Sequence, residues 1–265
     1  MAKKKTQDAL AVATPTGIMK WDDELAKYAQ AASDKEQIIA GQFLSVKSGQ
    51  MSLGGNPIKG NEVNVVVLKD IYENTYYEAE FDADNKGPPD CYAFGDDEKT
   101  MKPHEKASDP QAEKCSSCKM NEWGSSTKGK RTGKACQNRR RLALIPAGDL
   151  SPEAVAKAEV VYFKVPVTSG KFWGAYVKNV AATTRRPPFA VVTNVTCEPD
   201  PKTQVKVGFE LVDPAPQESL GALLARAKEQ EEGIRFPYPE AKEAPARPAP
   251  KASARKSKFK PRPTP

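Results

Sequence analysis

The sequence has little with which to build a conventional enzyme active site. It contains a single histidine, His104, so any histidine-based catalytic pair would have to use that residue. Neither a GxSxG nucleophile motif nor an HExxH metal motif occurs. The segment from Gly129 to Lys134 superficially resembles a phosphate-binding loop, but it lacks the strand before and the helix after that define one. These absences predict a protein that is not an enzyme.

Long apolar runs are also missing from the sequence. No stretch approaches the roughly 18 apolar residues that a membrane-spanning helix needs. The first residues carry three lysines, then Asp8 and a short Ala/Val run, which is too weak a pattern for a signal peptide. We therefore expect no membrane association and a reducing, cytoplasmic environment.

Charge is unevenly distributed along the chain. The net charge of +7 comes from residues 241–265, which hold eight Lys and Arg against Glu243 alone. From residue 236 onward Pro, Ala, Lys and Arg dominate, so we predict a disordered basic tail over 236–265. Within the neutral remainder, residues 114–141 are basic and residues 78–98 are acidic. A neutral body with basic segments suits a polyanionic partner.

Four of the five cysteines lie in one stretch. Cys115 and Cys118 form a CxxC pair, with 23 residues between Cys91 and Cys115 and 17 residues between Cys118 and Cys136. A CxxC turn places two thiolates on one side of a tight loop, and two more would close a tetrahedral, non-catalytic zinc shell. We predict one structural Zn²⁺ bound by Cys91, Cys115, Cys118 and Cys136. A CxxC redox pair, unliganded thiols, and His104 as fourth ligand in place of Cys91 are the alternatives.

The expected elements are typical of a mainly β domain. Patterns of β-branched and aromatic residues predict strands at 42–46, 51–53, 63–68, 74–81, 141–145, 160–165, 189–197 and 203–211. Apolar residues at helical spacing predict helices at 21–32, 171–182 and 219–232. We predict an OB-like Greek-key barrel over residues 36–235, with a zinc loop subdomain inserted at about 86–141 and an N-terminal arm with a short helix at 1–35. A generic α+β domain is the alternative. Cys197, in a strand-like run, is expected to be a packed or surface thiol.

Basic and aromatic residues around the cysteines predict contact with nucleic acid. Single strands are held by basic grooves lined with aromatic rings on which bases stack. Tyr76 and Tyr77 are adjacent on a predicted strand, so only one of them can face inward. The predicted contact residues are Trp123, Tyr76, Tyr77, Lys128, Lys130, Arg131, Lys134, Arg139, Arg140 and Arg141.

The cysteine stretch resembles a four-cysteine cassette found in phage and prophage proteins. The likeness is carried by Cys91-Tyr92, Pro110–Cys118, Asn121–Ser125, Gly133–Cys136 and Arg139–Leu142. Four cysteines occupy these positions in the cassette, which favours Cys91 over His104 as a ligand. The plan of a zinc loop inserted in a barrel is similar in architecture to the single-stranded DNA-binding proteins of T-even phages. That family uses one His with three Cys and ends in an acidic tail, whereas this chain ends in a basic one.

These observations and the resemblance together predict a phage-type single-stranded DNA-binding protein of replication or recombination, in the bacterial host cytoplasm. Zinc is the expected cofactor, and single-stranded DNA with replication or recombination proteins are the expected partners. Two alternatives stay open. One is a zinc-containing transcription or replication accessory factor that acts through protein contacts. The other is a Mg²⁺-dependent nuclease that uses Asp82, Asp84, Asp96 and Asp97.

Overall fold

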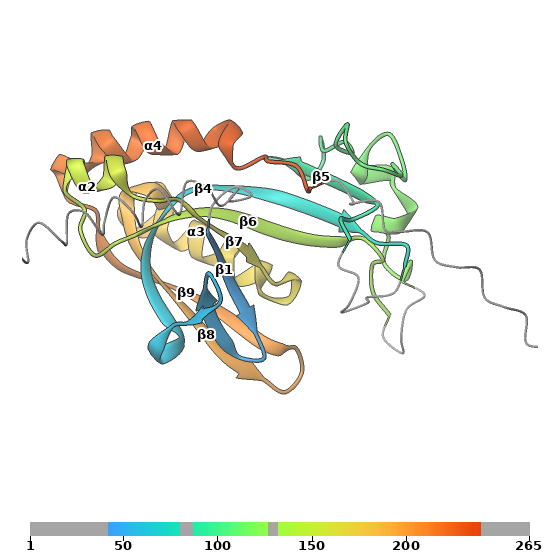
Figure 1. Cartoon of the computed structure of the whole chain (residues 1–265), viewed down its shortest axis with the longest axis horizontal. Helices are drawn as coiled ribbons and strands as arrows, with labels where there is room; N and C mark the ends of the chain where they lie inside the picture. The colour runs from blue at the N-terminus through green and yellow to red at the C-terminus, as the bar shows by residue number, and fades with distance from the viewer. Residues whose placement is uncertain (1–41, 80–86, 127–131, 240–265) are drawn as a thin grey trace, which may run out of the picture.

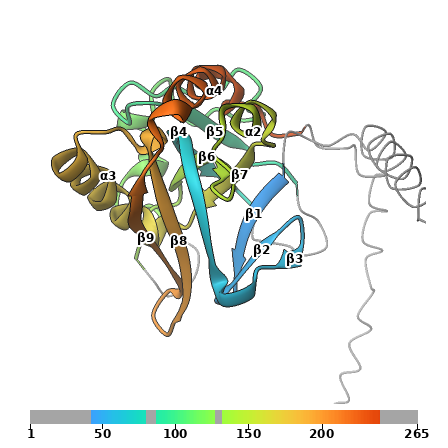
Figure 2. The ribbon, with the colours of Figure 1, turned by 90° about the vertical axis from the view of Figure 1, so that its left-hand side faces the viewer.

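The protein folds around one curled β-sheet with helices against both faces (Figures 1 and 2). The computed structural model describes residues 42–79, 87–126 and 132–239. The nine strands run in the order β3-β2-β1-β7-β6-β4-β8-β9, with β5 paired to β4. This confirms a mainly β fold. The predicted N-terminal arm and the helix at 21–32 lie outside the described residues.

Within the described residues, strands occur along the whole chain and the three α-helices lie in its second half. The strands are β1 (Gln42–Lys47), β2 (Gln50–Leu53), β3 (Asn56–Pro57), β4 (Glu62–Tyr76), β5 (Cys91–Gly95), β6 (Gln137–Pro146), β7 (Val161–Val165), β8 (Val191–Asp200) and β9 (Gln204–Pro214). The helices are α2 (Pro152–Lys157), α3 (Gly170–Thr184) and α4 (Leu220–Gly233), and two 3-10 turns, η2 (Cys115–Ser117) and η3 (Lys119–Asn121), carry the CxxC pair. No helix in the described ranges is long and apolar enough to cross a membrane.

The long strand β4 connects the body of the domain to the cysteine stretch. Along one edge, its first residues pair with β8 and its last, Tyr72–Tyr76, pair with β5. Along the other edge, β6 pairs with it from Val65 to Thr75. Strands β4 and β6 therefore extend together out of the body and end beside the cysteines, as Figure 1 shows.

The core lies on both faces of the sheet. Val65 and the other odd-numbered apolar residues at the start of β4 pack with Trp173 of α3, whereas Val66 and its even-numbered neighbours pack with Leu223 of α4 and with α2. Residues Val65 to Leu68 are all buried, because a strand covered on both faces has no solvent side. Burying a side chain of this kind contributes about 1.5–3 kcal/mol.

The ends of the sheet curl toward each other as in half of a barrel (Figure 2). The turn between β1 and β2 contains Gly49 with a φ of +77°, a conformation that favours glycine. A Cβ at Gly49 would lie 2.7 Å from Cγ of Pro199 in β8, so the turn packs closely against the far end of the sheet. Glycine is required here both by the backbone conformation and by the close approach.

The predicted elements match the structure best where the spacing of residues close in sequence is enough to define a helix or a strand. The strands predicted at 42–46 and 51–53, which pair as an antiparallel hairpin, and the helices predicted at 171–182 and 219–232 are confirmed. The two strands predicted at 63–68 and 74–81 are one strand, β4, with an irregularity between Val67 and Lys69. Strand β6 pairs with β4 on both sides of this irregularity, so the strand continues through Asp70. The sequence patterns did not predict β5 or α2.

The chain stays packed beyond the end of α4. Phe236 lies against Tyr162, with ring centroids 4.7 Å apart, and the hydroxyl of Tyr238 donates to Glu73 Oε1 at 2.5 Å. Residues 236–239, assigned to the tail from their composition, therefore belong to the folded part. The rest of the predicted tail lies outside the described residues.

Candidate functional site

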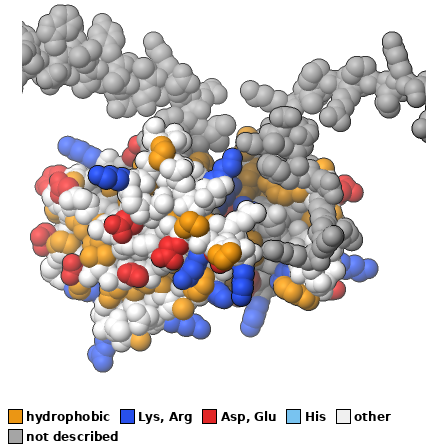
Figure 3. Space-filling view, turned by 90° about the horizontal axis from the view of Figure 1, so that it is seen from below, with side chains coloured by type: hydrophobic (Ala, Val, Ile, Leu, Met, Phe, Trp, Pro, Cys, Tyr) orange, Lys and Arg blue, Asp and Glu red, His pale blue; other side chains and the backbone are white. Residues whose placement is uncertain are grey.

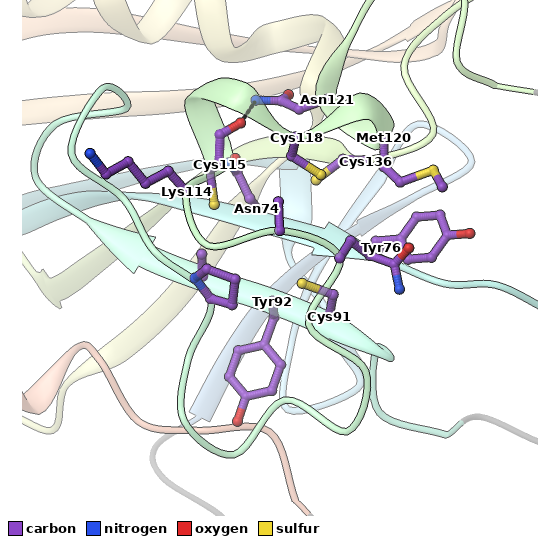
Figure 4. A pocket seen from close by; sticks show the side chains of 14 residues that line it. Asn74, Tyr76, Cys91, Tyr92, Lys114, Cys115, Cys118, Met120, Asn121 and Cys136 are labelled. Carbon is purple, nitrogen blue, oxygen red and sulfur yellow. Dashed lines mark hydrogen bonds between the residues drawn. The ribbon is translucent and has the colours of Figure 1, made fainter.

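The four clustered cysteines surround one small cavity at the end of β4, β5 and β6 (Figure 4). Cys91 begins β5, Cys115 begins the η2 turn, Cys118 directly follows that turn, and Cys136 directly precedes β6. Figure 4 shows the η turns on one side of this space and β5 on the other. The cavity has a volume of about 20 Å³, enough for one water-sized group. Segments separated by up to 45 positions in the chain thus line one cavity, as the spacing predicted.

Backbone hydrogen bonds hold the cysteine segments in place. The N–H of Cys115 donates to the carbonyl of Met101 at 3.0 Å, and the N–H of Cys136 donates to the carbonyl of Met120 at 2.8 Å. The N–H of Cys118 donates to Cys115 O at 3.4 Å, which closes the CxxC turn. The turn presents both side chains toward the cavity, the geometry that a paired-thiolate ligand needs.

The thiols influence one another electrostatically. Burial is the largest cause that raises the pKa of Cys136 to about 12, and the neighbouring Cys115, Cys118 and Cys91 raise it further. The pKa of Cys115 is raised for the same reasons. A cluster of this kind stays protonated unless a cation compensates the thiolate charge. All five cysteines are free thiols.

The four thiols suit a thiophilic cation, although their sulfur atoms are not drawn together around a single point. Among the described residues, no three His, Cys, Asp or Glu side chains are close enough together to form a ready metal-binding group. The chemistry of four thiols around a cavity of one-atom size nevertheless fits zinc better than Mg²⁺ or Ca²⁺, which prefer oxygen ligands.

His104 lies on the other side of β5 from the cysteine cavity. Its ring stacks on Tyr92, with centroids 4.9 Å apart, and its Nδ1 accepts from the N–H of Lys106 at 3.1 Å. It lines a separate groove with Phe94 and Phe236 and does not line the cysteine cavity. Cys91 does line that cavity, so the geometry favours Cys91 over His104.

The loop between Cys118 and Cys136 presents an exposed tryptophan. Trp123 is 75% exposed, the most exposed of the large apolar side chains in the described residues. Next to it, Gly124 has a φ of +91°, and its N–H donates to the carbonyl of Gly133 at 2.9 Å. This bond and the one from Cys136 to Met120 close the base of the loop, so backbone hydrogen bonds hold the turn that carries Trp123.

Basic residues flank Trp123 on both sides in the sequence. Lys134 is exposed, and its Nζ donates to Asn121 Oδ1 at 3.1 Å. Lys114 and Lys119, beside the CxxC pair, are also exposed. Lys128, Lys130 and Arg131 lie outside the described residues.

The prediction that Arg141 contacts nucleic acid is wrong, because the side chain is buried. Arg141 is 1% exposed, with Nη2 2.6 Å from Oε1 of the buried Glu73. Its neighbour Arg140 points to the other face, where it pairs with Asp70 at 3.1 Å and lies over the Tyr72 ring. The run of three arginines is part of strand β6, so alternate side chains face opposite ways and two of them bind within the sheet.

The remaining predicted contacts fall in different environments. Tyr77 is 37% exposed, while Tyr76 is half-buried and lines the cysteine cavity. Arg139 is half-buried and donates to Gln137 Oε1 at 2.5 Å. Cys197 is buried in the core below α3, the packed position that its strand suggested.

The carboxylates considered for a nuclease do not form a site in the described chain. Asp96 is bound by Lys69 at 2.9 Å and by Arg235, and these cations hold its pKa below the usual value although burial acts to raise it. Asp82 and Asp84 lie outside the described residues.

Figure 3 shows acidic and basic side chains interspersed on the face seen from below.

Comparisons with known proteins identify no relative. No protein-family model, no curated protein and no solved structure matches this chain.

Proposed function

We propose that the protein binds single-stranded DNA without catalysing a reaction, through the loop that carries Trp123. The observation that supports this most directly is the 75% exposure of Trp123 on a turn closed by the cysteine segment and flanked by lysines. An exposed indole offers a face on which a base can stack, and the neighbouring lysines can contact phosphates. The loop's sequence, Lys119 to Lys134, holds further basic residues.

The cysteine cavity would have a structural role in this function. One zinc ion drawn in by Cys91, Cys115, Cys118 and Cys136 would pull the sulfurs together and fix both ends of the Trp123 loop. The rigid loop would lose less conformational entropy when it binds a strand. Free thiols and a zinc site both suit the reducing bacterial cytoplasm, the location we propose.

We further propose that the curled sheet is an opened Greek-key barrel of the OB type. Support comes from the close approach of Gly49 to Pro199 and from helix α3, which is inserted between β7 and β8 and packs on one face of the sheet. A phage origin, with a role in replication or recombination, remains the interpretation that the cassette resemblance suggests.

Titration of the protein with single- and double-stranded DNA at several salt concentrations tests the function. We expect tighter binding to single strands, with affinity that falls as salt rises. Failure to bind either form would contradict the proposal and favour a role in protein contacts. Preference for the duplex, or cleavage with Mg²⁺, would favour a transcriptional or nuclease role.

Replacement of Trp123 tests the stacking contact. We expect Trp123→Ala to weaken single-strand binding by about 1–3 kcal/mol, the cost of losing one stacked base. Leu224→Ala is the matched control, because Leu224 is 43% exposed on α4, outside the cysteine loop. Equal affinities of Trp123→Ala and Leu224→Ala would show that Trp123 is not a stacking residue.

A further inference from the structure

Asn74 is a buried polar side chain between the sheet and the cysteines. It is 3% exposed, belongs to the extended part of β4, and lines the same cavity as the four thiols (Figure 4). Cys115, which begins the η2 turn, lines the same cavity. A buried amide needs partners at both its oxygen and its nitrogen, so these partners determine which way it points.

Asn138 determines the orientation of the Asn74 amide. The two residues lie opposite each other in the register of β4 and β6, and Asn138 Nδ2 donates to Asn74 Oδ1 at 2.7 Å. Because Oδ1 is the end that accepts from Asn138, the Nδ2 group of Asn74 is the end available to donate to a thiolate in the cavity, such as that of Cys115. An N–H donor aimed at sulfur stabilises a thiolate more than a thiol.

A second residue with an N–H donor, Gln111, lines the same cavity as Cys91 at the start of β5. Cys115 and Cys91 come from the two walls of the cavity, the η turns and the sheet (Figure 4). N–H donors that line the cavity, from Asn74 on the sheet and from Gln111, match the outer shell of a metal–thiolate centre, where hydrogen bonds orient the ligands and stabilise their charge.

We infer that Asn74 and Asn138 form the outer shell of a zinc–thiolate centre, in which Asn138 orients Asn74 and Asn74 positions Cys115. This inference rests on the proposed four-cysteine zinc site and extends it to residues of the main sheet. It gives a reason for the common extension of β4 and β6: the paired strands place an amide donor next to the ligand. Asn74 is a positioning residue and would not touch the metal.

Metal titrations of side-chain variants test the inference. We expect Asn74→Leu to bind Zn²⁺ about 10–100-fold more weakly than the wild type, measured by competition with a chromophoric chelator. Asn74→Asp should lose at least as much, because a carboxylate cannot donate and repels the thiolates. In the Co²⁺-substituted proteins, the sulfur-to-cobalt charge-transfer band should shift in both variants, a change that a purely structural role of Asn74 would not produce.

The chain offers a closely matched control on the same strand. Asn194 Nδ2 donates to Asn64 Oδ1 at 2.8 Å, which is another cross-strand asparagine pair on β4, but an exposed one outside the cysteine cavity. Asn194→Leu should leave Zn²⁺ affinity and the Co²⁺ spectrum unchanged. Asn138→Ala, which keeps Asn74 but frees its amide, should cause a smaller loss than Asn74→Leu.

The outcomes separate this inference from the proposed site itself. A wild-type protein that binds neither Zn²⁺ nor Co²⁺ would overturn the four-cysteine site. A wild type that binds, together with an Asn74→Leu variant of equal affinity and identical Co²⁺ spectrum, would overturn the role of Asn74 alone. Should Asn74→Leu fail to fold, Asn138→Ala carries the same test.

Discussion

Glu73 and Arg141 form a buried ion pair in the strands that lead to the cysteines. The two side chains are 0% and 1% exposed. Arg141 Nη1 donates to the carbonyls of Ile234 and Phe236 at 3.1 Å each, and Tyr238 donates to Glu73. The pair therefore ties the segment after α4 to the sheet, and each charged group has several partners.

Removal of the carboxylate should be costly. We expect Glu73→Gln to destabilise the fold by about 3–5 kcal/mol, because it leaves the Arg141 guanidinium buried without a counter-charge. Urea unfolding followed by circular dichroism measures the loss. Glu229→Gln is the control, since the side chain of Glu229 is 57% exposed and its pair with Arg226 is expected to contribute about 0–1 kcal/mol. Similar losses in both variants would contradict the importance of the buried pair.

The Glu73–Arg141 pair also predicts that the stability of the fold falls at acidic pH. Burial acts to raise the pKa of Glu73, but the charge and hydrogen bonds of Arg141 outweigh it and lower the pKa below 4.5. The folded state then binds fewer protons than the unfolded state at this group, so the contribution is complete above pH 4.5 and is lost as the pH falls through the folded pKa. Glu73→Gln should lack this part of the acid sensitivity.

At the scale of elements, the paired strands β4 and β6 position part of the cysteine site. Cys136 leads directly into β6, and Tyr76 at the end of β4 pairs with Cys91 of β5. The sheet thus sets the positions of two cysteines, while the η turns set the other two. A metal would join these two parts, whose tight packing otherwise rests on a small cluster of Ala93, Met101 and Cys115.

Loss of one ligand should therefore affect the whole cysteine segment. We expect the wild type to hold about one zinc per chain, and Cys136→Ser to release it and to raise hydrogen exchange across residues 91–136. Metal analysis of protein purified without chelators and hydrogen-exchange mass spectrometry measure the two effects. Cys197→Ser, in the core below α3, should keep its zinc. A wild type without zinc would remove the basis for the site.

At the scale of the whole molecule, basic charge is concentrated in two parts of the sequence. One is the cysteine stretch and the other is the tail, where residues 241–265 hold eight Lys and Arg against Glu243. The described chain ends at Pro239, just after Tyr238, which packs against Glu73. A truncation meant to remove only the tail should therefore end at Pro239.

Removal of residues 240–265 should weaken single-strand binding without unfolding the protein. Each lost phosphate contact should reduce the salt slope of the binding constant by about 0.7. Binding measured at several salt concentrations gives this slope, and thermal unfolding checks stability. A shorter chain that ends at residue 235 should also lose stability, because it lacks Phe236 and Tyr238. An unchanged slope after truncation at Pro239 would show that the tail makes no contact.

Sequence patterns predicted the features that depend on neighbouring residues. The apolar stripe of Trp173 and Tyr176 predicted α3, and the strand patterns at 42–46 and 51–53 predicted β1 and β2. The spacing of the cysteines predicted that they share one site. The run of three arginines predicted exposed side chains, because basic residues in a run are usually solvated. For Arg141 this prediction was wrong, since its side chain is buried. Its partner Glu73 is 68 positions away, and no local signal joins the two.

The sequence by itself determined the mainly β class, the helices, the division of charge and the grouping of four cysteines, because these follow from periodicity, composition and spacing. Only the tertiary structure decided that β4 is one continuous strand, that Arg141 is a core residue, and that Asn74 lines the cysteine cavity while His104 does not. Those outcomes depend on strand register. Register sets which face each side chain takes, and it is fixed by pairing between distant segments.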